Sequence, residues 1–481
     1  MMRAFLIAGT ALALAGCTVG PNYSRPEMPV PAGYAKPAAV DGSVDVAHWW
    51  TAFGDPRLTA LVERALADNP TIQIAASRVR QARLQEIVTR AAALPQVNAS
   101  ANASHVEFSR NGGFASIARQ FQGGQGGGGG GLALPGTGIT TYAIGFDASW
   151  ELDLFGGVRR QREAARARAE AAEWSARDAA ITLAAEVADA YFALRLDQAQ
   201  IALVEREIAG EQRSIEIAQN QARAGVTPSI DAIRARAALT QAQARIEPLR
   251  ADAELRIHAL GVLTGQAPEA LLAELQAPGA ELGAPPAVPA GLPADLLRRR
   301  PDIRAAERRL AAATADIGVQ VAQLYPRISL TGTAQLLSAG LSNIISGDSF
   351  QGTGSGAISF PLLDWGRRRA NVKIAREAGE QAYSDYKATV LQALRDVEDP
   401  LSRMDAERRR NAVLRQTLAD AERNRAAIEA RFRAGLVSQD AVIAAEVQRL
   451  TAAEQVAASD ALLRQQTAAL FKAIGGGWQS S

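Results

Sequence analysis

The stretches Trp150-Glu-Leu-Asp-Leu-Phe155-Gly156 and Phe360-Pro-Leu-Leu-Asp-Trp365-Gly366 decide the fold of this chain. Before each stretch, apolar residues recur at every second position, which is the period of a β-strand. After each stretch, a helical pattern continues for roughly 65 residues. The Phe155-Gly156 and Trp365-Gly366 pairs lie 210 residues apart. We therefore expect a duplicated unit in which a strand passes into a very long helix.

The composition excludes several classes of protein. The 481 residues carry a formal net charge of +2, which gives no electrostatic basis for binding nucleic acid. No apolar run of helix length follows the N-terminal region, so we expect no transmembrane helix. His48, His105 and His258 are isolated, and no nucleophile–base pair is recognisable. We therefore expect no metal site, no cofactor and no enzymatic activity.

The N-terminus resembles the signal of a bacterial lipoprotein. Arg3 precedes an apolar run that is too short to span a bilayer and that ends in Leu14-Ala-Gly-Cys17. We expect residues 1–16 to be removed and Cys17 to carry several acyl chains, palmitate among them, which anchor the chain durably. A plain signal peptide with an incidental cysteine is the alternative. Thr18, in place of an aspartate, points to the outer membrane.

The order of domains follows from composition and periodicity. The expected segments are a lipidated tether at 17–55, a first repeat at 56–275, a Pro-rich linker at 276–294, a second repeat at 295–475 and a tail at 476–481. Alternating apolar residues predict strands at about 96–108, 139–152, 327–337 and 352–362. Aromatic residues at both ends of the apolar face, as in 139–152, are typical of a strand that crosses an outer membrane.

The helices have recognisable starts, seams and ends. Asp55 and Asn69 each precede a proline, which predicts two helix N-termini. Val187 and Leu194 begin an apolar series spaced at seven, which is typical of a coiled-coil seam. Pro400 lies inside the second long helix, where it removes a hydrogen bond and can kink the helix. The glycines at 225 and 435 predict turns after which shorter helices return.

The predicted strands require more than one copy of the chain. Four strands cannot close, and open strand edges are not stable in lipid. Three copies would supply twelve strands, although the pattern itself does not select three over two or four. The expected fold is a mixed α+β membrane protein with a duplicated strand hairpin and long helical hairpin. Its trimer would form a 12-stranded outer-membrane β-barrel continued by an α-helical coiled-coil periplasmic tunnel.

Several motifs in order carry a resemblance to a known family. They are Cys17-Thr-Val-Gly20-Pro21, Trp49-Trp50, Trp150-Glu-Leu-Asp-Leu-Phe-Gly156, Leu297-Arg-Arg-Arg-Pro301, Leu324-Tyr-Pro-Arg-Ile328 and Phe471-Lys-Ala-Ile-Gly-Gly-Gly-Trp478. The chain resembles the outer-membrane factors, the TolC/OprM-like efflux ducts, in their lipoprotein (NodT-type) branch. The resemblance covers nearly the whole chain after the signal.

The resemblance implies a function and a set of partners. It implies a homotrimer in outer-membrane lipid that works with a periplasmic adaptor (membrane fusion protein) and an inner-membrane transporter of the RND type. The chain would then be a passive exit duct for drugs or other small toxic compounds. Type I protein secretion is the alternative within this class. A lipid-anchored periplasmic adaptor or structural coiled coil is the alternative from another class, which the presence of two helical hairpins disfavours.

The resemblance also implies where the functional residues lie. The two glycine turns would form the periplasmic tip, which is closed at rest and meets the adaptor. The implied gate residues are Asp231, Asp440, Arg223, Arg433 and Phe432. The implied adaptor contacts are Gly225, Val226, Thr227, Gly435, Leu436 and Val437. Asp231 can also serve as a helix cap, and a ring of its copies in a narrow pore would select cations.

Overall fold

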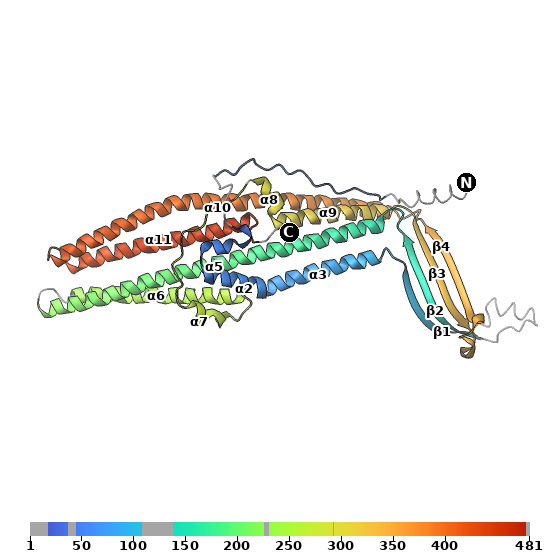
Figure 1. The fold of residues 1–481 in the computed structure, drawn as a ribbon, viewed down its shortest axis with the longest axis horizontal. Helices are drawn as coiled ribbons and strands as arrows, with labels where there is room; N and C mark the ends of the chain where they lie inside the picture. The colour runs from blue at the N-terminus through green and yellow to red at the C-terminus, as the bar shows by residue number, and fades with distance from the viewer. Residues whose placement is uncertain (1–17, 37–44, 108–137, 226–229, 292, 478–481) are drawn as a thin grey trace, which may run out of the picture. The chain divides into compact units, whose positions relative to one another are not determined.

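The structure, a computed structural model, describes residues 18–36, 45–107, 138–225, 230–291 and 293–477 (Figure 1). The chain divides into two compact units. The first unit comprises residues 1–24, 83–167 and 311–380, and the second comprises residues 25–82, 168–310 and 381–481. Four helices pass from one unit to the other, namely α3 (Pro70–Ala91), α5 (Gly157–Arg223), α9 (Pro301–Ala322) and α10 (Arg367–Arg433).

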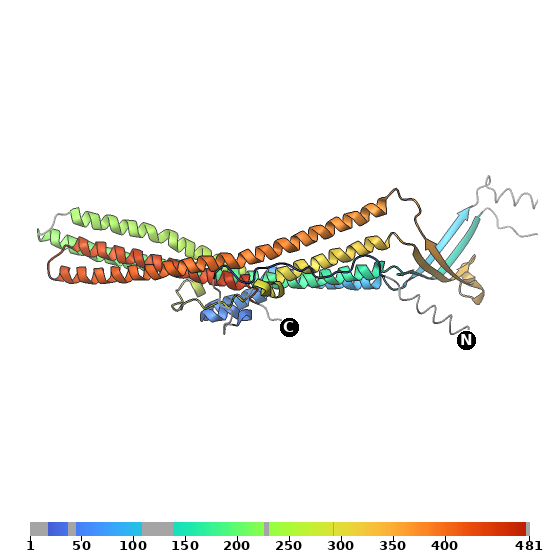
Figure 2. The ribbon, with the colours of Figure 1, turned by 90° about the horizontal axis from the view of Figure 1, so that it is seen from above.

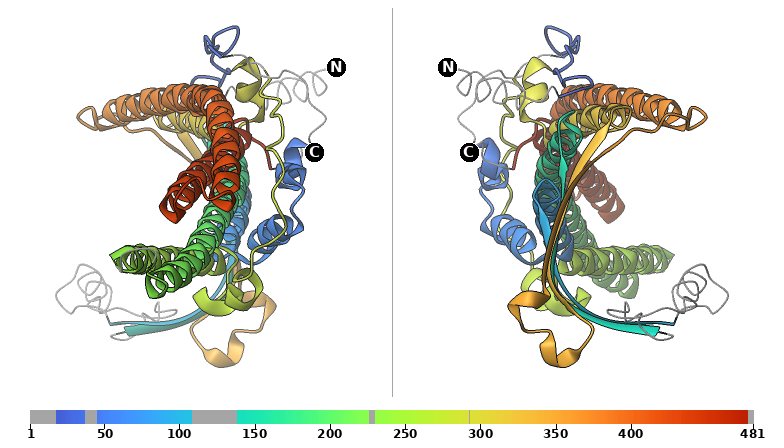
Figure 3. Two further views of the ribbon diagram at one scale, coloured as in Figure 1. Left: turned by 90° about the vertical axis from the view of Figure 1, so that its left-hand side faces the viewer. Right: turned by 90° about the vertical axis from the view of Figure 1, so that its right-hand side faces the viewer.

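The first unit contains one antiparallel sheet. Its strands are β1 (Gln96–Glu107), β2 (Gly138–Leu152), β3 (Arg327–Ser338) and β4 (Phe350–Ser359), in the order β1-β2-β3-β4. Figure 3 shows that the strands curve along their length. In register, Phe146 lies between Ala99 of β1 and Ala334 of β3, so the middle pairing joins the two halves of the duplicated chain. Within the described residues, β1 and β4 form the edges of the sheet.

The expected alternation of side chains is present on the strands. Phe146 and Ile144 on β2 are 61% and 48% exposed, although they belong to the apolar series. The polar series pairs across strands, since the hydroxyl groups of Thr333 and Thr353 lie 2.6 Å apart. The short 3-10 helices η3 (Leu341–Asn343) and η4 (Gly347–Ser349) connect β3 to β4. The sheet therefore presents a row of apolar side chains that the described part of this single chain leaves exposed.

The second unit is built on two helical hairpins. Helix α5 packs against α6 (Ile230–Leu263), and α10 packs against α11 (Gln439–Ala473) (Figure 2). Arg245 of α6 forms ion pairs with Glu207 of α5 at 3.0 Å and with Glu454 of α11 at 2.8 Å, so it links the two hairpins. The shorter elements are η1 (Val46–Phe53), α2 (Pro56–Asp68), η2 (Pro268–Leu271), α7 (Leu272–Leu275) and α8 (Pro293–Arg299).

The core of the second unit lies where the short elements meet the long helices. The expected seam residues Val187 and Leu194 are buried, with Tyr191 between them. The expected caps are also present, because Asp55 Oδ1 accepts from the Arg57 N–H at 2.8 Å and Asn69 Oδ1 accepts from the Thr71 N–H at 2.7 Å. Each cap satisfies a backbone donor that the helix itself cannot pair.

The structure refines several expectations. Helix α3 ends at Ala91, and a short turn leads to Pro95. Helix α10 continues through the buried Pro400 as one element of 67 residues. A second internal proline, Pro248 of α6, was not anticipated. Among the described residues, no helix is long and apolar enough to cross a membrane.

The N-terminal segment is held more closely than a tether needs to be. The Val19 N–H donates to the carbonyl of Phe155 at 3.1 Å in the first unit. Within the second unit, Arg25 donates to the carbonyl of Leu297 at 2.9 Å. The expected lipidation site Cys17 lies outside the described residues.

Candidate functional site

The two strand-to-helix junctions have matching local structures. Asp153 accepts from the N–H groups of Val158 and Arg159 at the start of α5, at 3.1 and 2.9 Å. Asp364 accepts from the N–H groups of Gly366 and Arg368 at the start of α10, at 3.1 and 3.2 Å. A carboxylate therefore stabilises the N-terminus of each 67-residue helix.

Glycine at each junction adopts a backbone conformation that other residues rarely adopt. Gly156 has φ of +78° and Gly366 has φ of +87°. A side chain on Gly156 would also meet the Cα atom of Thr18 at 2.8 Å, whereas a side chain on Gly366 would have open space. Among the described residues, the N-terminal segment therefore packs against the first junction and not against the second.

The two turns of the expected tip end their helices in the same way. Gly225 and Gly435 have φ of +68° and +69°, and their N–H groups donate to the carbonyls of Ala222 and Phe432. The Leu436 N–H then donates to the carbonyl of Arg431 at 2.9 Å. Left-handed glycines of this kind terminate helices by satisfying their last carbonyls. Val226 and Thr227 lie outside the described residues.

The expected gate residues lie at the ends of the helices that flank these turns. Arg223 donates to Asn220 Oδ1 and Arg433 donates to Glu429 Oε1, each at 2.5 Å and each within its own helix. Asp440 is exposed in the first turn of α11, and Phe432 is half-buried. Among the described contacts of this single chain, none joins these charged side chains to one another. Asp231 belongs to the first turn of α6, and its side chain is outside the described structure.

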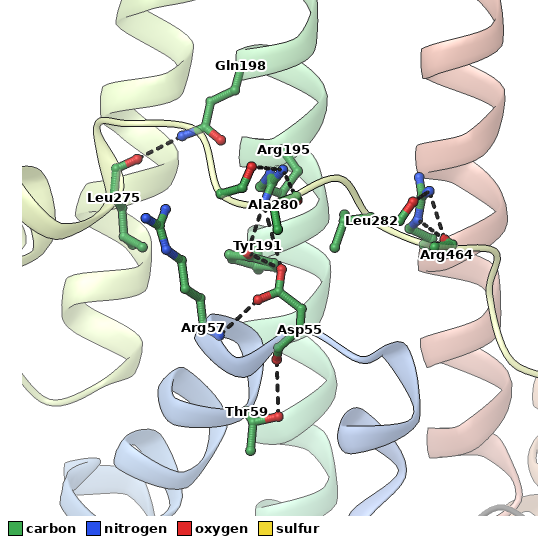
Figure 4. A network of polar contacts seen from close by, with 12 residues as sticks. Asp55, Arg57, Thr59, Tyr191, Arg195, Gln198, Leu275, Ala280, Leu282 and Arg464 are labelled. Atoms are coloured by element: carbon green, nitrogen blue, oxygen red, sulfur yellow. Dashed lines mark hydrogen bonds and ion pairs between the residues drawn. The ribbon is translucent and has the colours of Figure 1, made fainter.

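A polar network that the sequence did not reveal lies in the second unit (Figure 4). Asp55 Oδ2 accepts from the hydroxyl of Tyr191 at 2.5 Å and lies 3.6 Å from Arg195. Burial, and then the bond to Asp55, raises the pKa of Tyr191 to about 12. The side chains that meet here are separated by more than 130 residues in the chain, so no local pattern could have brought them together.

The same network fixes the linker between the two repeats. Arg195 donates to the carbonyls of Gly279 and Ala280 at 3.1 and 2.7 Å, and Arg464 donates to the carbonyl of Leu282 at 2.8 Å. Gln198 donates to the carbonyl of Leu275 at 2.7 Å. Because all these acceptors are backbone carbonyls, the linker is held with little dependence on its own side chains.

The run Arg298-Arg299-Arg300 is only partly exposed. Arg298 and Arg299, in the last turn of α8, are exposed. Arg300 is only 8% exposed, and it donates to Asp302 and Asp396 at 2.6 and 3.0 Å and to the carbonyl of Ala473 at 3.1 Å. Its position before Pro301 places it among helices α9, α10 and α11, where carboxylates replace water.

The described residues contain no cluster of side chains that could hold a metal ion. The geometry instead consists of an open sheet, two long helical hairpins and two glycine turns. This arrangement offers surfaces and positioned charges.

Comparison with known proteins gives one consistent result. The family model described as outer membrane efflux protein matches residues 61–266 and 292–476. The outer membrane protein OprJ of Pseudomonas aeruginosa is 31% identical over 475 residues, which cover 97% of this chain and 94% of OprJ. Nodulation protein T of Rhizobium leguminosarum is 31% identical over 414 residues (86% and 84%). The cation efflux system protein CusC of Escherichia coli is 30% identical over 485 residues (98% and 97%).

The fold is likewise that of a solved channel. The outer-membrane channel OprN has a TM-score of 0.84 to this chain, with 32% sequence identity, and the match covers 96% of this chain and 100% of the OprN chain.

Proposed function

The chain belongs to the outer membrane efflux protein family and is an outer-membrane efflux channel protein; we propose that three copies of it form one exit duct. The resemblance that the sequence motifs carry is thereby confirmed. In the proposed trimer, the sheets of three chains close a 12-stranded barrel and the helical hairpins continue it as a periplasmic tunnel.

The single observation that carries this proposal is the open sheet. Strands β1 and β4 each have one partner among the described residues, so each chain presents two unpaired edges. In lipid, each unpaired backbone N–H or C=O group costs roughly several kcal/mol of free energy. Only closure of the sheet into a barrel removes both edges. Pairing of β4 with β1 of the next copy would satisfy these groups, and three copies would supply an even number of strands within the known range.

Helix α3 also has apolar surface that a neighbouring copy could cover. On α3, Ile74, Leu84, Ile87 and Val88 are each more than half exposed. Exposed aliphatic side chains repeated along one helix are typical of a surface that another protein buries.

The experiment is to measure the mass of the intact assembly. Protein extracted from outer membranes in mild detergent should give a native mass of three chains, with no population of single chains. A mass of one or two chains would contradict the trimer, because two four-stranded sheets supply eight strands and leave the proposed tunnel incomplete. The matched control is the same preparation after thermal denaturation, which should give the single-chain mass.

We further propose that the tip formed by the two glycine turns is the regulated end of the duct. Gly225, Gly435, Leu436 and Val437 would contact the periplasmic adaptor, together with Val226 and Thr227. Asp231, Asp440, Arg223, Arg433 and Phe432 would hold the tip closed at rest. The duct would be passive, and an inner-membrane transporter of the RND type would supply the energy.

The cargo and the anchor complete the proposal. We propose that the duct exports drugs or other small toxic compounds. The relative CusC is named for cation efflux, so a panel of antibiotics and metal salts applied to a deletion strain would separate these classes of cargo. Increased susceptibility to neither class would contradict an efflux role for small compounds. We propose lipidation at Cys17, for which a Cys17→Ala variant should lose the mass of the acyl chains.

A further inference from the structure

One carboxylate oxygen of Glu211 is buried and has no hydrogen-bond partner among the described residues. Glu211 lies on α5 and is 5% exposed, and its Oε2 atom accepts no hydrogen bond from any described residue. Burial, and then repulsion from Glu207, raises the pKa of Glu211. An ionised carboxylate removed from water and left unpaired is costly, so such a group either takes up a proton or is matched by a cation.

A cavity of about 270 Å³ adjoins this carboxylate, and we call it the Glu211 cavity. Its walls come from three helices, with Glu211 on α5, Ala235 and Ala238 on α6, and Gln439, Asp440 and Ile443 on α11. The Oε1 atom of Gln439 is also buried and accepts no hydrogen bond from the described part of the chain. The cavity therefore combines two unsatisfied acceptor oxygens with an apolar wall.

The side chains that line the Glu211 cavity include more carboxylates than guanidinium groups. Glu211 and Asp440 supply two carboxylates, and Arg234 supplies one guanidinium. A neighbouring cavity of about 340 Å³ also reaches Glu211, but four arginines line it, namely Arg206, Arg213, Arg425 and Arg433. There Arg425 pairs with Glu446 at 3.1 Å and Arg433 pairs with Glu429 at 2.5 Å. The Glu211 cavity is therefore the one that a positively charged ligand would enter.

We propose that the Glu211 cavity binds a small organic cation, whose ammonium group donates to the carboxylate of Glu211 and the amide oxygen of Gln439. The alkyl part of the ligand would lie against Ala235, Ala238 and Ile443. Charge-assisted hydrogen bonds to a buried carboxylate are about twice as strong as neutral ones, so the charge decides the selectivity.

The bound cation would also have a structural effect. Glu211 belongs to the first helical hairpin, and Gln439 lies at the start of α11 in the second. A ligand that bonds to both side chains would hold the two hairpins together close to the turn at Gly435. The proposal stands apart from the efflux role, because binding can be measured whether or not the protein conducts.

The test is calorimetric titration of the full chain, purified in detergent, with n-hexylammonium chloride. The wild type should bind one ligand per chain, and neutral n-hexanol should not bind. Glu211→Gln, which keeps the shape and removes the charge, should weaken binding by about tenfold or more. The control is Glu216→Gln, an exposed glutamate on the same helix, which should bind like the wild type. Equal binding by the Glu211→Gln protein, or no binding by the wild type, would overturn the proposal.

A second variant protects the test against misfolding. Ala238→Leu fills the cavity from the α6 side and leaves every charge in place. An Ala238→Leu protein that assembles with the wild-type mass should not bind n-hexylammonium, because the leucine side chain occupies the cavity. Undiminished binding of n-hexylammonium by this variant would place the ligand elsewhere and overturn the proposal.

Discussion

The indole ring of Trp49 stacks on the phenyl ring of Phe471, with centroids 5.4 Å apart and planes inclined by 11°. Both side chains are fully buried, although one lies near the start of the chain and the other near the end of the last long helix. Phe53 packs against Trp49 on one side and against Phe192 of α5 on the other. The η1 segment therefore joins the two hairpins within the second unit through aromatic contacts.

Removal of Trp49 should destabilise this unit. Trp49→Ala should cost about 3–5 kcal/mol, because a large buried ring leaves a cavity that its neighbours fill only in part. Trp49→Phe should cost less, since it keeps a ring over Phe471. The melting temperature of the purified protein, followed by circular dichroism, measures both effects. Equal melting temperatures for the wild type and Trp49→Ala would show that the stack contributes nothing.

The Asp55–Tyr191 bond should make stability depend on alkaline pH. The pKa of Tyr191 is raised to about 12 in the folded chain, and that of an unperturbed tyrosine is about 10. The contribution of Tyr191 to the free energy of unfolding is therefore fully present below about pH 10, and it is lost as the pH rises towards 12. Tyr34, whose pKa is raised to about 12 by its own burial, adds to the same loss.

Tyr191→Phe separates the two tyrosines. This variant should lose less stability than the wild type between pH 10 and 12, because its phenyl ring cannot ionise. Melting temperatures measured at steps of pH across this window give the comparison. Parallel curves for the two proteins would rule out a role for the Tyr191 proton.

The strands and helices of this chain could be predicted from its sequence, whereas its buried polar contacts could not. The strand limits of β1 and the lengths of the long helices followed from local periodicity and from the residues that end helices. The pairing of Asp55 with Tyr191 could not be predicted, because it depends on how two distant segments pack. The same holds for the bond of Arg300 to Asp396 on α10, which is 96 residues away. Local pattern gave the elements, and side-chain geometry determined which polar groups became buried partners.

The two junction glycines should differ in their sensitivity to substitution. Gly366→Ala should lower the free energy of unfolding by about 1–2 kcal/mol, because the left-handed backbone is unfavourable for alanine. The space around the added methyl group is open. Gly156→Ala should cost more, since its methyl group would also meet Thr18. Each variant is the matched control of the other, and melting temperatures measure both. A larger loss for Gly366→Ala would contradict the closure of the N-terminal segment on the first junction.

The proposed gate should respond to removal of its charges. Replacing Asp231, Asp440, Arg223 and Arg433 together by alanine removes the groups that would bond between copies at the tip. Within one chain, the described hydrogen bonds of Arg223 and Arg433 are to residues of their own helices, so the four changes should leave each hairpin intact. The matched control replaces Glu247 and Arg250 of α6 by alanine, which removes their exposed ion pair and the exposed ion pair of Arg250 with Glu205 of α5.

Single-channel conductance in planar lipid bilayers is the most direct test of the proposal that the exit duct is closed at rest. The wild type and the Glu247→Ala, Arg250→Ala control should show the same small conductance, because the tip is shut in both. The variant with all four gate residues replaced should show a conductance that is larger by roughly severalfold. The reason is that ion pairs between copies no longer hold the tip closed. A gate variant that conducts no more than the wild type would contradict a duct held closed by these residues.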